Sequence, residues 1–383
     1  MCTDVLGQKN NGTTIAALNL AEYLKSRGHN VRIICPEGSQ APGFDCYLLP
    51  HKSLFPFDKY VEKNGVVIAK AKTDVIEKAI KDADVVHCMT PLNASLATCR
   101  QVIKEGKPLT AGFHCQAENI TAHIFLKNFA PANHIAYKIM YDKLYKYCDA
   151  IHFPTQFIKD VFESEVHRNF TCGRVISNGV NSCFRHIDAR KPAEFKDKFV
   201  ILFTGRYARE KSHEILIKAV SESRHVDDIQ LIFAGKGPLE AKLRKMSAHL
   251  LKNQPVFGFY SRDELVNVIN YADLYCHPAE IEIEAISCLE AIACGLVPVI
   301  SDSPKSATRY FALDERNSFK YNDPADLAAK IDYWIEHPSE RAECSRTYAG
   351  YSAQFDFDKC MREMEKMLLD ACESHCKKSG QAI

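Results

Sequence analysis

The sequence predicts an α/β fold of two domains, each with a parallel sheet covered by helices. Three observations support this prediction. The chain has 383 residues, enough for two domains with substantial cores. Short apolar strand patterns alternate with helical patterns along most of its length. A polar segment at residues 181–198 interrupts the alternation. We therefore expect domains at residues 1–185 and 186–355, followed by a C-terminal helical segment at residues 356–383.

Composition restricts the class of protein. Hydrophobic residues make up 46% and charged residues 25%, which is ordinary for a globular protein. There is no run of eighteen apolar residues and no apolar leader, so we expect a cytoplasmic protein without a membrane span. The 16 cysteines are scattered and form no CxxC pair. We interpret them as reduced and mostly buried, and expect neither disulfides nor a zinc site.

The first domain begins with a polar loop from Asp4 to Gly12 that contains Asn10 and Asn11. Thr13 or Thr14 can cap a helix that continues to Arg27. Further helices are expected at residues 73–81, 92–105 and 155–163. Strands are expected at residues 31–35, 66–69, 85–88, 109–113 and 150–153.

The second domain repeats the alternation. Strands are expected at residues 199–203, 229–233, 256–257, 274–276 and 296–300. Helices are expected at residues 212–222, 238–250, 262–270, 324–336, 338–352 and 356–377. Alternation at this spacing is typical of parallel sheets.

The stretch from Pro278 to Val299, PAEIEIEAISCLEAIACGLVPV, carries two carboxylates eight positions apart, Glu282 and Glu290. Eight positions are slightly over two helical turns, so we expect both side chains on nearly one face of a helix that ends at Gly295. Helix ends beside a parallel sheet are common sites for anions and polyols. The alternative is a solvated helix face.

Two cations follow the first strand of the second domain. Arg206 lies in Thr-Gly-Arg-Tyr at residues 204–207, and Lys211 comes five positions later. Fixed cations in a closed cleft can stabilise charge on a leaving diphosphate without a metal ion. The alternative is two surface cations on a turn.

Two further features are weaker. Gly235 and Gly237 form a lone Gly-x-Gly without the third glycine and downstream acid of a dinucleotide site. His114 ends a predicted strand and is either functional or a core or capping histidine.

These motifs together resemble the retaining glycosyltransferases of family 4, which have the GT-B architecture of two Rossmann-like domains facing a central cleft. The family pattern Glu-x7-Glu, followed by Ala-x-Ala-x-Gly, matches from Glu282 to Gly295. Its Gly-Arg-x4-Lys pattern matches from Gly205 to Lys211. One departure is Ile283-Glu284-Ala285, where the family usually has Gly-Phe-Gly. The family also begins with a strand before the first loop. Only three residues precede Asp4, so that strand is either truncated or absent, and we favour truncation.

The resemblance implies a hexosyltransferase that uses a nucleotide sugar, UDP-glucose in our interpretation, as donor substrate and needs no metal or other cofactor. It assigns the catalytic residues as His114 and Glu282, with Glu282 on the sugar hydroxyls. It assigns the donor-binding residues as Gly12, Arg206, Lys211, Tyr260, Ile286 and Glu290. Among these, Arg206 and Lys211 would bind the diphosphate, and Glu290 the ribose. The C-terminal helix would cross back to the first domain, which would bind the acceptor.

The acceptor is the least determined feature. Residues 113–147 are rich in aromatic and basic side chains: Phe125, Lys127, Phe129, Tyr137, Lys138, Tyr141, Lys143, Tyr145, Lys146 and Tyr147. Residues 1–185 hold 22 Lys and Arg against 17 Asp and Glu. Such chemistry suits an anionic membrane surface.

The run from Gly112 to Thr121 also resembles bacterial diacylglycerol glucosyltransferases of the family. We expect a lipid acceptor at the inner membrane face, and no nucleic acid partner. The alternatives are aromatic side chains that merely pack the domain and a soluble sugar or polyol acceptor. Two other function classes also stay open: a sugar-nucleotide epimerase and a non-catalytic nucleotide-sugar sensor.

Overall fold

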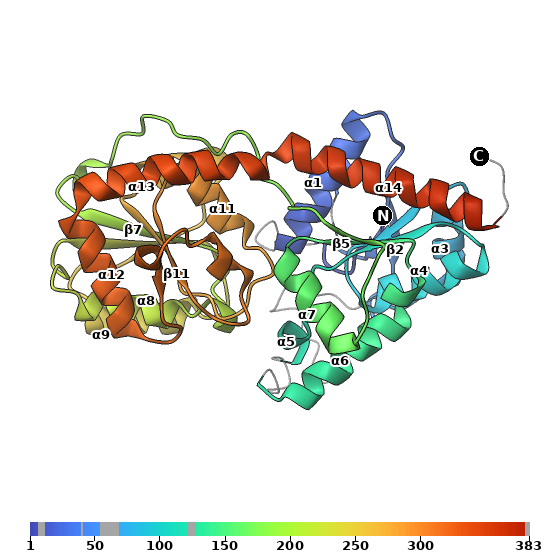
Figure 1. Ribbon diagram of the computed structural model, residues 1–383, viewed down its shortest axis with the longest axis horizontal. Coiled ribbons are helices and arrows are strands. Elements are labelled where there is room, and N and C mark those ends of the chain that lie inside the picture. Colours follow the sequence, from blue (N-terminus) through green and yellow to red (C-terminus); the bar gives the residue numbers. More distant parts are fainter. Residues whose placement is uncertain (7–11, 40, 54–68, 122–127, 380–383) are drawn as a thin grey trace. The chain divides into compact units, whose positions relative to one another are not determined.

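The computed structural model describes residues 1–6, 12–39, 41–53, 69–121 and 128–379, and these residues form two α/β units (Figure 1). Unit 1 comprises Met1–Asn178 and Asp358–Ile383, and unit 2 comprises Gly179–Phe357. The chain therefore leaves unit 1 at Asn178, slightly before the boundary that we expected at residue 185. The predicted α/β class with parallel sheets is confirmed.

The first residues of the chain lie between two strands of the unit 1 sheet. β1 (Arg32–Pro36) pairs in parallel with β2 (Asp45–Leu49). The parallel strands β3 (Val86–Cys88), β4 (Leu109–Gly112), β5 (Ala150–Phe153) and β6 (Gly173–Val175) follow in that order. Cys2 forms parallel bridges to Ile34 of β1 and to Cys88 of β3. Met1–Thr3 thus lie where the family's first strand is expected, so that strand position is not empty.

Helices of unit 1 are α1 (Gly12–Ser26), α3 (Thr73–Ile80), α4 (Asn93–Lys104), α5 (Ala117–Thr121), α6 (Ala130–Lys143) and α7 (Gln156–Val166). Asp4 fixes α4, because its carboxylate accepts hydrogen bonds from the main-chain nitrogens of Ala94 at 2.6 Å and Ser95 at 3.2 Å. The predicted cap at Thr155 is confirmed, since its hydroxyl accepts from the nitrogen of Ile158 at 3.3 Å. Of the predictions, the Asn10-Asn11 loop and residues 66–68 lie outside the described residues. Neither β2 nor β6 was predicted as a strand.

The last helix, α14 (Phe357–Ser379), packs on unit 1. His375 Nδ1 lies 2.9 Å from a carboxylate oxygen of Asp149. Glu365 lies 2.8 Å from the ring of His29 and 3.3 Å from the guanidinium of Arg27. Its buried apolar side chains, at helical spacing, are Met361, Met364, Met367, Leu368 and Ala371.

Unit 2 is a parallel sheet in the order β12 (Ser318–Phe319), β11 (Pro298–Ser301), β10 (Leu274–His277), β7 (Phe199–Thr204), β8 (Ile229–Ala234) and β9 (Val256–Gly258). The chain runs outward from β7 in one direction and from β10 in the other. In such sheets the strand order reverses at a crevice outside the carboxyl ends of the two central strands, where ligands bind. The carboxyl ends of β7 and β10 therefore mark the expected site.

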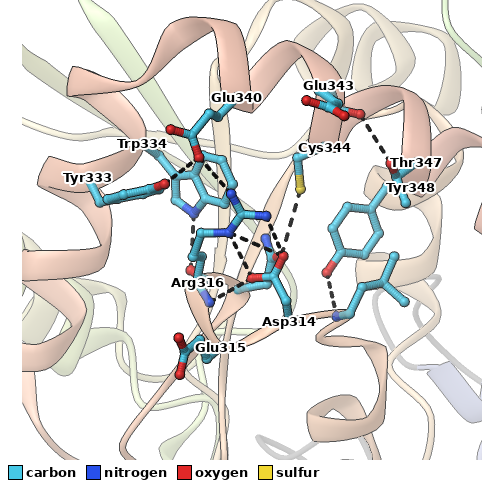
Figure 2. Close-up of polar contacts among 12 residues, drawn as sticks. Asp314, Glu315, Arg316, Tyr333, Trp334, Glu340, Glu343, Cys344, Thr347 and Tyr348 are labelled. Atoms are coloured by element: carbon cyan, nitrogen blue, oxygen red, sulfur yellow. Dashed lines mark hydrogen bonds and ion pairs between the residues drawn. The ribbon is translucent and has the colours of Figure 1, made fainter.

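Helices cover both faces of this sheet: α8 (His213–Glu222), α9 (Glu240–Leu250), α10 (Arg262–Tyr271), α11 (Ile286–Ala293), α12 (Pro324–Glu336) and α13 (Pro338–Tyr351). In Figure 1, α8, α9 and α12 lie on one side and α11 and α13 on the other. Figure 2 shows the polar network that joins α12 to α13. Arg316 donates to Asp314 at 2.7 Å and to Glu340 at 2.7 Å, and its guanidinium lies 5.5 Å from the Trp334 ring. This network is a structural link and includes none of the predicted site residues.

Two expectations from composition can be compared with the structure. All 16 cysteines lie within the described residues and are free, nine of them buried: Cys2, Cys35, Cys88, Cys99, Cys276, Cys288, Cys294, Cys344 and Cys360. Among the described helices, none is both long and apolar enough to cross a membrane.

Candidate functional site

The candidate site of unit 2 lies at the carboxyl ends of β7 and β10. β7 ends at Thr204, and the loop with Gly205 and Arg206 follows directly. β10 ends at His277, and the loop after it carries Glu282. The parallel pairing of β7 with β10 brings these two loops to the same edge of the sheet.

The prediction that Glu282 and Glu290 share one helix face is wrong. Helix α11 begins only at Ile286, so Glu290 is helical and Glu282 is not. Ala285 has φ 59° and ψ 70°, a left-handed conformation that does not continue a right-handed helix. Glu282 instead forms a parallel bridge to Ser306, and its carbonyl accepts from the nitrogen of Ala307 at 2.8 Å. Long-range backbone pairing therefore overrides the helical spacing.

Glu282 and Lys211, two of the predicted residues, form a direct ion pair. The Lys211 ammonium donates to Oε1 of Glu282, and Nε2 of His277 lies 3.1 Å from the same oxygen. The Glu282 side chain is almost fully buried. Burial alone would raise the pKa of Glu282, but Lys211 and His277 outweigh it and lower the pKa to about 2. Glu282 is thus a carboxylate at neutral pH.

Arg206 is the second predicted cation. Its guanidinium lies 3.1 Å from Glu210, four residues along the same loop. Both Arg206 and Lys211 are only partly exposed and each faces a carboxylate. The site therefore holds two fixed cations and two carboxylates at one strand edge.

The Gly-x-Gly segment has a packing role. A Cβ atom on Gly235 would lie 2.0 Å from the carbonyl oxygen of Gly205. One on Gly237 would lie 2.5 Å from the carbonyl oxygen of Tyr207. The nitrogen of Tyr207 also donates to the carbonyl of Lys236 at 3.0 Å. The glycines let the loops after β7 and β8 cross in contact, which fixes the backbone that carries Arg206.

The remaining predicted residues of unit 2 lie on neighbouring elements. Glu290 is half-buried on α11, and burial raises its pKa to about 8 although the charge of Arg262 opposes this. Ile286 begins α11. Tyr260 is half-buried in the loop after β9. Within the described residues, no hydrogen bond or ion pair joins Glu290 or Tyr260 to the Lys211–Glu282 pair.

The predicted residues of unit 1 are His114 and Gly12. His114 follows β4, and its Nε2 atom is buried without a hydrogen-bond partner in the described structure. A Cβ atom on Gly112 would lie 2.5 Å from that nitrogen, so the imidazole lies directly over the Gly112 backbone. Burial lowers the pKa of His114 well below its usual value. Gly12 is exposed at the start of α1, where a Cβ atom would meet nothing within 4 Å.

Sequence reasoning missed three residues behind Glu282. The Tyr275 hydroxyl lies 3.2 Å from Nδ1 of His277 and 3.0 Å from the hydroxyl of Thr204. All three side chains are buried at the carboxyl ends of β7 and β10. Their position at the ends of the two strands beside the order reversal is the signal that could have found them.

Among the described residues, neither a surface hollow nor a metal-binding cluster adds to this site. A shallow surface hollow of about 390 Å³ lies at the end of α7 and contains no predicted site residue. Within the same residues, no group of three or more His, Cys, Asp or Glu side chains is arranged to hold a metal ion.

Comparisons with known proteins match the chain to a family. The family model described as Glycosyltransferase Family 4 matches residues 10–182, and that described as Glycosyl transferases group 1 matches residues 184–349. The two matches together cover most of both units.

Individual proteins agree with these matches. The chain is 24% identical to an alpha-monoglucosyldiacylglycerol synthase of Acholeplasma laidlawii, over 96% of each chain. It is 25% identical to a phosphatidyl-myo-inositol mannosyltransferase of Mycobacterium tuberculosis, over 76% of this chain and 74% of the relative. The crystal structure of HepE from Anabaena, in complex with UDP and glucose, has a similar fold with a TM-score of 0.74 and 16% identity, over 96% of this chain and 98% of HepE. The chain therefore belongs to the GT-B glycosyltransferases that resemble family 4.

Proposed function

We propose that the protein transfers a hexose with retention of configuration from a nucleotide sugar, UDP-glucose, to a diacylglycerol-type lipid at an anionic membrane surface. In this proposal Arg206 and Lys211 bind the diphosphate, and Glu282 binds hydroxyls of the sugar. Glu290 binds the ribose, beside the start of α11 at Ile286. Tyr260 contacts the base, and Gly12 and His114 of unit 1 stay predicted donor-binding and catalytic residues.

The observation that carries the donor assignment is the Lys211–Glu282 pair beside Arg206 at the carboxyl ends of β7 and β10. A nucleotide sugar presents a diphosphate next to a ring of hydroxyls, and this edge presents fixed cations next to a buried carboxylate. Charge-assisted hydrogen bonds of both kinds are strong and directional. The arrangement therefore suits the two halves of such a donor.

The same edge can support the transfer step. The bond between the anomeric carbon and the β-phosphate oxygen breaks, and the acceptor oxygen forms a bond to that carbon on the same face. The acceptor proton passes to the departing phosphate oxygen, so no protein nucleophile is needed. Arg206 and Lys211 stabilise the charge that develops on the diphosphate.

The choice of UDP-glucose has two supports. HepE was crystallised with UDP and glucose, and the relative from Acholeplasma is named for a glucosyl lipid. The mycobacterial relative is named for mannose, so GDP-mannose is the donor to test against UDP-glucose.

The lipid acceptor is supported by an exposed apolar surface on and beside α6. Phe129, Ile135 and Ile139 are 54%, 57% and 52% exposed, although such side chains usually lie inside. Ile135 and Ile139 are one helical turn apart, and the exposed Lys138 lies next to Ile139. Apolar side chains flanked by lysines suit the headgroup region of an anionic bilayer. We name Phe129, Ile135, Lys138 and Ile139 the α6 surface.

The structure restricts this interpretation of the aromatic segment. Tyr137 and Tyr145 are fully buried and pack with Phe113 and Phe162 in the core of unit 1, so they are not available to a membrane. Their packing agrees with the alternative interpretation that we gave for these tyrosines. Phe125 and Lys127 lie outside the described residues. A soluble sugar or polyol acceptor is therefore the second candidate.

A donor and acceptor panel tests the proposal. Purified protein is incubated with UDP-glucose, UDP-galactose or GDP-mannose, and with diacylglycerol, phosphatidylinositol, cholesterol or free glucose as acceptor. Mass analysis should detect a hexosyl lipid and acceptor-dependent release of UDP. Products with free glucose alone would favour the second candidate, and the absence of any product from every donor would contradict the proposed activity.

Vesicle sedimentation tests the membrane part separately. The protein should pellet with vesicles that contain anionic lipid at low salt and should be released as salt rises. Ile135→Ser with Ile139→Ser should abolish pelleting. Leu369→Ser is the matched control, because Leu369 is equally exposed but lies on α14. Equal pelleting of both variants would refute the role of the α6 surface.

We also propose that transfer needs no divalent metal ion. Arg206 and Lys211 would supply the positive charge that a metal ion supplies in other diphosphate sites. Activity should survive EDTA. Loss of activity in EDTA that manganese restores would refute this part of the proposal.

A further inference from the structure

Behind Glu282 a chain of buried hydrogen bonds joins the two central strands of unit 2. It runs from Thr204, the last residue of β7, to Tyr275 and His277 on β10, and ends on the Glu282 carboxylate. The successive distances are 3.0 Å, 3.2 Å and 3.1 Å. Tyr275 and His277 are two residues apart on one strand, so their side chains share a face of the sheet. Their rings stack with centroids 5.8 Å apart.

The ionised carboxylate at one end of this series of hydrogen bonds, and the neutral imidazole beside it, fix the direction of the bonds. Glu282 is ionised at neutral pH and can only accept a hydrogen bond. Burial lowers the pKa of His277, so its imidazole is neutral and carries one proton. That proton must lie on Nε2, which faces Glu282. Nδ1 is then an acceptor, so the Tyr275 hydroxyl must donate to it. The Thr204 hydroxyl in turn donates to Tyr275 at 3.0 Å, a shorter contact than the 3.5 Å to its other acceptor, the carbonyl oxygen of Ser287.

The series of hydrogen bonds ends on one oxygen of the Glu282 carboxylate. The hydrogen bonds from Lys211 and His277 both end on Oε1. Oε2 accepts no hydrogen bond from any residue that the structure describes. Oε1 is thus held by the protein, and Oε2 is left to accept from a ligand.

The same series of hydrogen bonds also reaches the start of α11. The Ser287 hydroxyl, in the first turn of α11, donates to the carbonyl oxygen of Thr204 at 3.1 Å. Thr204 also precedes the loop that carries Arg206. A single network of buried and half-buried polar groups therefore joins the loop that carries Arg206, the loop that carries Glu282 and the helix that carries Glu290.

We propose that Thr204, Tyr275 and His277 form a directed hydrogen-bond relay that orients Glu282 toward the hydroxyls of the donor sugar. This inference rests on the proposed sugar-binding role of Glu282. Tyr275 and His277 are positioning residues, because they contact Glu282 or each other and not the donor. They determine how well the sugar is held in the transfer step and leave the nucleotide half of the donor unaffected.

Two variants of His277 separate orientation from simple packing. In His277→Gln the side-chain amide nitrogen can replace Nε2 as the donor to Glu282, whereas His277→Phe keeps the ring volume without any donor. We expect His277→Gln to retain kcat within about fivefold and His277→Phe to lose about 100-fold, because a buried carboxylate loses a hydrogen bond. Tyr275→Phe should lose about 10-fold, as expected for one neutral hydrogen bond. In all three variants the Kd for UDP should stay within about twofold, because the relay does not contact the nucleotide.

Matched controls come from the same unit. Tyr348 is a fully buried tyrosine whose hydroxyl donates to the carbonyl of Phe311 at 3.0 Å, remote from Glu282. His213 is a fully buried histidine whose ring nitrogens have no hydrogen-bond partner within the described residues. Tyr348→Phe and His213→Phe should therefore leave kcat unchanged. If these two variants lose as much activity as Tyr275→Phe and His277→Phe, the relay is only part of the core and the inference fails.

A measurement without substrate keeps the relay distinguishable from the proposed function. Imidazole nitrogen NMR of histidine-labelled protein, with His277→Gln to assign the signal, should show neutral His277 with its proton on Nε2. Tyr275→Phe should shift the Nδ1 signal toward that of a nitrogen without a hydrogen bond. A proton on Nδ1, or a protonated ring at pH 7, would overturn the relay even if the enzyme is active. The expected tautomer in a protein that transfers no sugar would refute the proposed function and uphold the hydrogen-bond direction.

Discussion

Glu290 gives the sharpest prediction, because its ionisation and its proposed role oppose each other. Burial raises its pKa to about 8 in the ligand-free protein, so most molecules hold a neutral Glu290 at pH 7. A carboxyl group that accepts a ribose hydroxyl on each of its two oxygens must be ionised, because a protonated carboxyl uses one oxygen as a donor. Binding of UDP should therefore release a proton from Glu290.

The magnitude follows from linkage. With a pKa of about 8, the ionised fraction rises from about 1% at pH 6 to about 50% at pH 8. The affinity for UDP should rise about 50-fold over this range, or about 2.3 kcal/mol. At pH 7 the protein should release about 0.9 proton per UDP bound.

Calorimetry in two buffers of different ionisation enthalpy measures the proton release directly. UDP itself titrates, because its terminal phosphate has a second pKa of about 6, and Glu290→Gln corrects for this. That variant should bind UDP more weakly at pH 8 and lose the steep pH dependence. Glu282→Gln should keep both affinity and pH dependence but lose turnover. Equal pH dependence in wild type and Glu290→Gln, or equal loss of UDP affinity in both variants, would refute the assigned roles.

Three further predictions concern stability. Lys211→Met should lower the unfolding free energy by about 3–5 kcal/mol, because it leaves Glu282 buried without its cation. Adding Glu282→Gln should recover most of that loss. Thermal unfolding of the two single variants and the double variant measures this, and additive losses would contradict the prediction. His213 has its pKa lowered to about 3 by burial, whereas the unfolded imidazole binds protons below about pH 6.5, so its contribution to stability is complete above that pH and is lost as the pH falls toward 3. Between pH 7 and pH 5, the unfolding free energy of the wild type should therefore fall by about 2 kcal/mol more than that of His213→Phe, as measured by denaturant unfolding. An equal fall in both proteins would exclude a buried neutral ring at His213. Ala285→Gly should stabilise the protein by about 1 kcal/mol, because glycine adopts the left-handed φ of 59° without strain. The control Ala241→Gly, on the exposed face of α9, should destabilise the protein by a similar amount. Equal shifts of the unfolding temperature with the same sign would argue against strain at Ala285.

The sequence by itself determined the alternation of strands and helices, and through it the fold class. Val86–Cys88, Leu109–Gly112 and Ala150–Phe153 were predicted within one residue at each end, because buried parallel strands are short apolar runs between polar loops. The same signal was missed for β2, Asp45–Leu49, where an apolar run is present but only Leu49 is buried and the residues before it are half-buried or exposed. Order, spacing and the family resemblance together also singled out Arg206, Lys211 and Glu282, whose donor-binding roles stay predictions.

Tertiary structure decided how these residues are arranged. Periodicity suggested one helix through Glu282 and Glu290, but pairing with residues 305–307 and the left-handed Ala285 separate them. The ion pair of Lys211 with Glu282 joins residues 71 positions apart in the sequence, and so does the contact between Thr204 and Tyr275. Local sequence carries propensity and spacing, but the ionisation of a buried carboxylate and the direction of its hydrogen bonds depend on groups that only the folded sheet brings together.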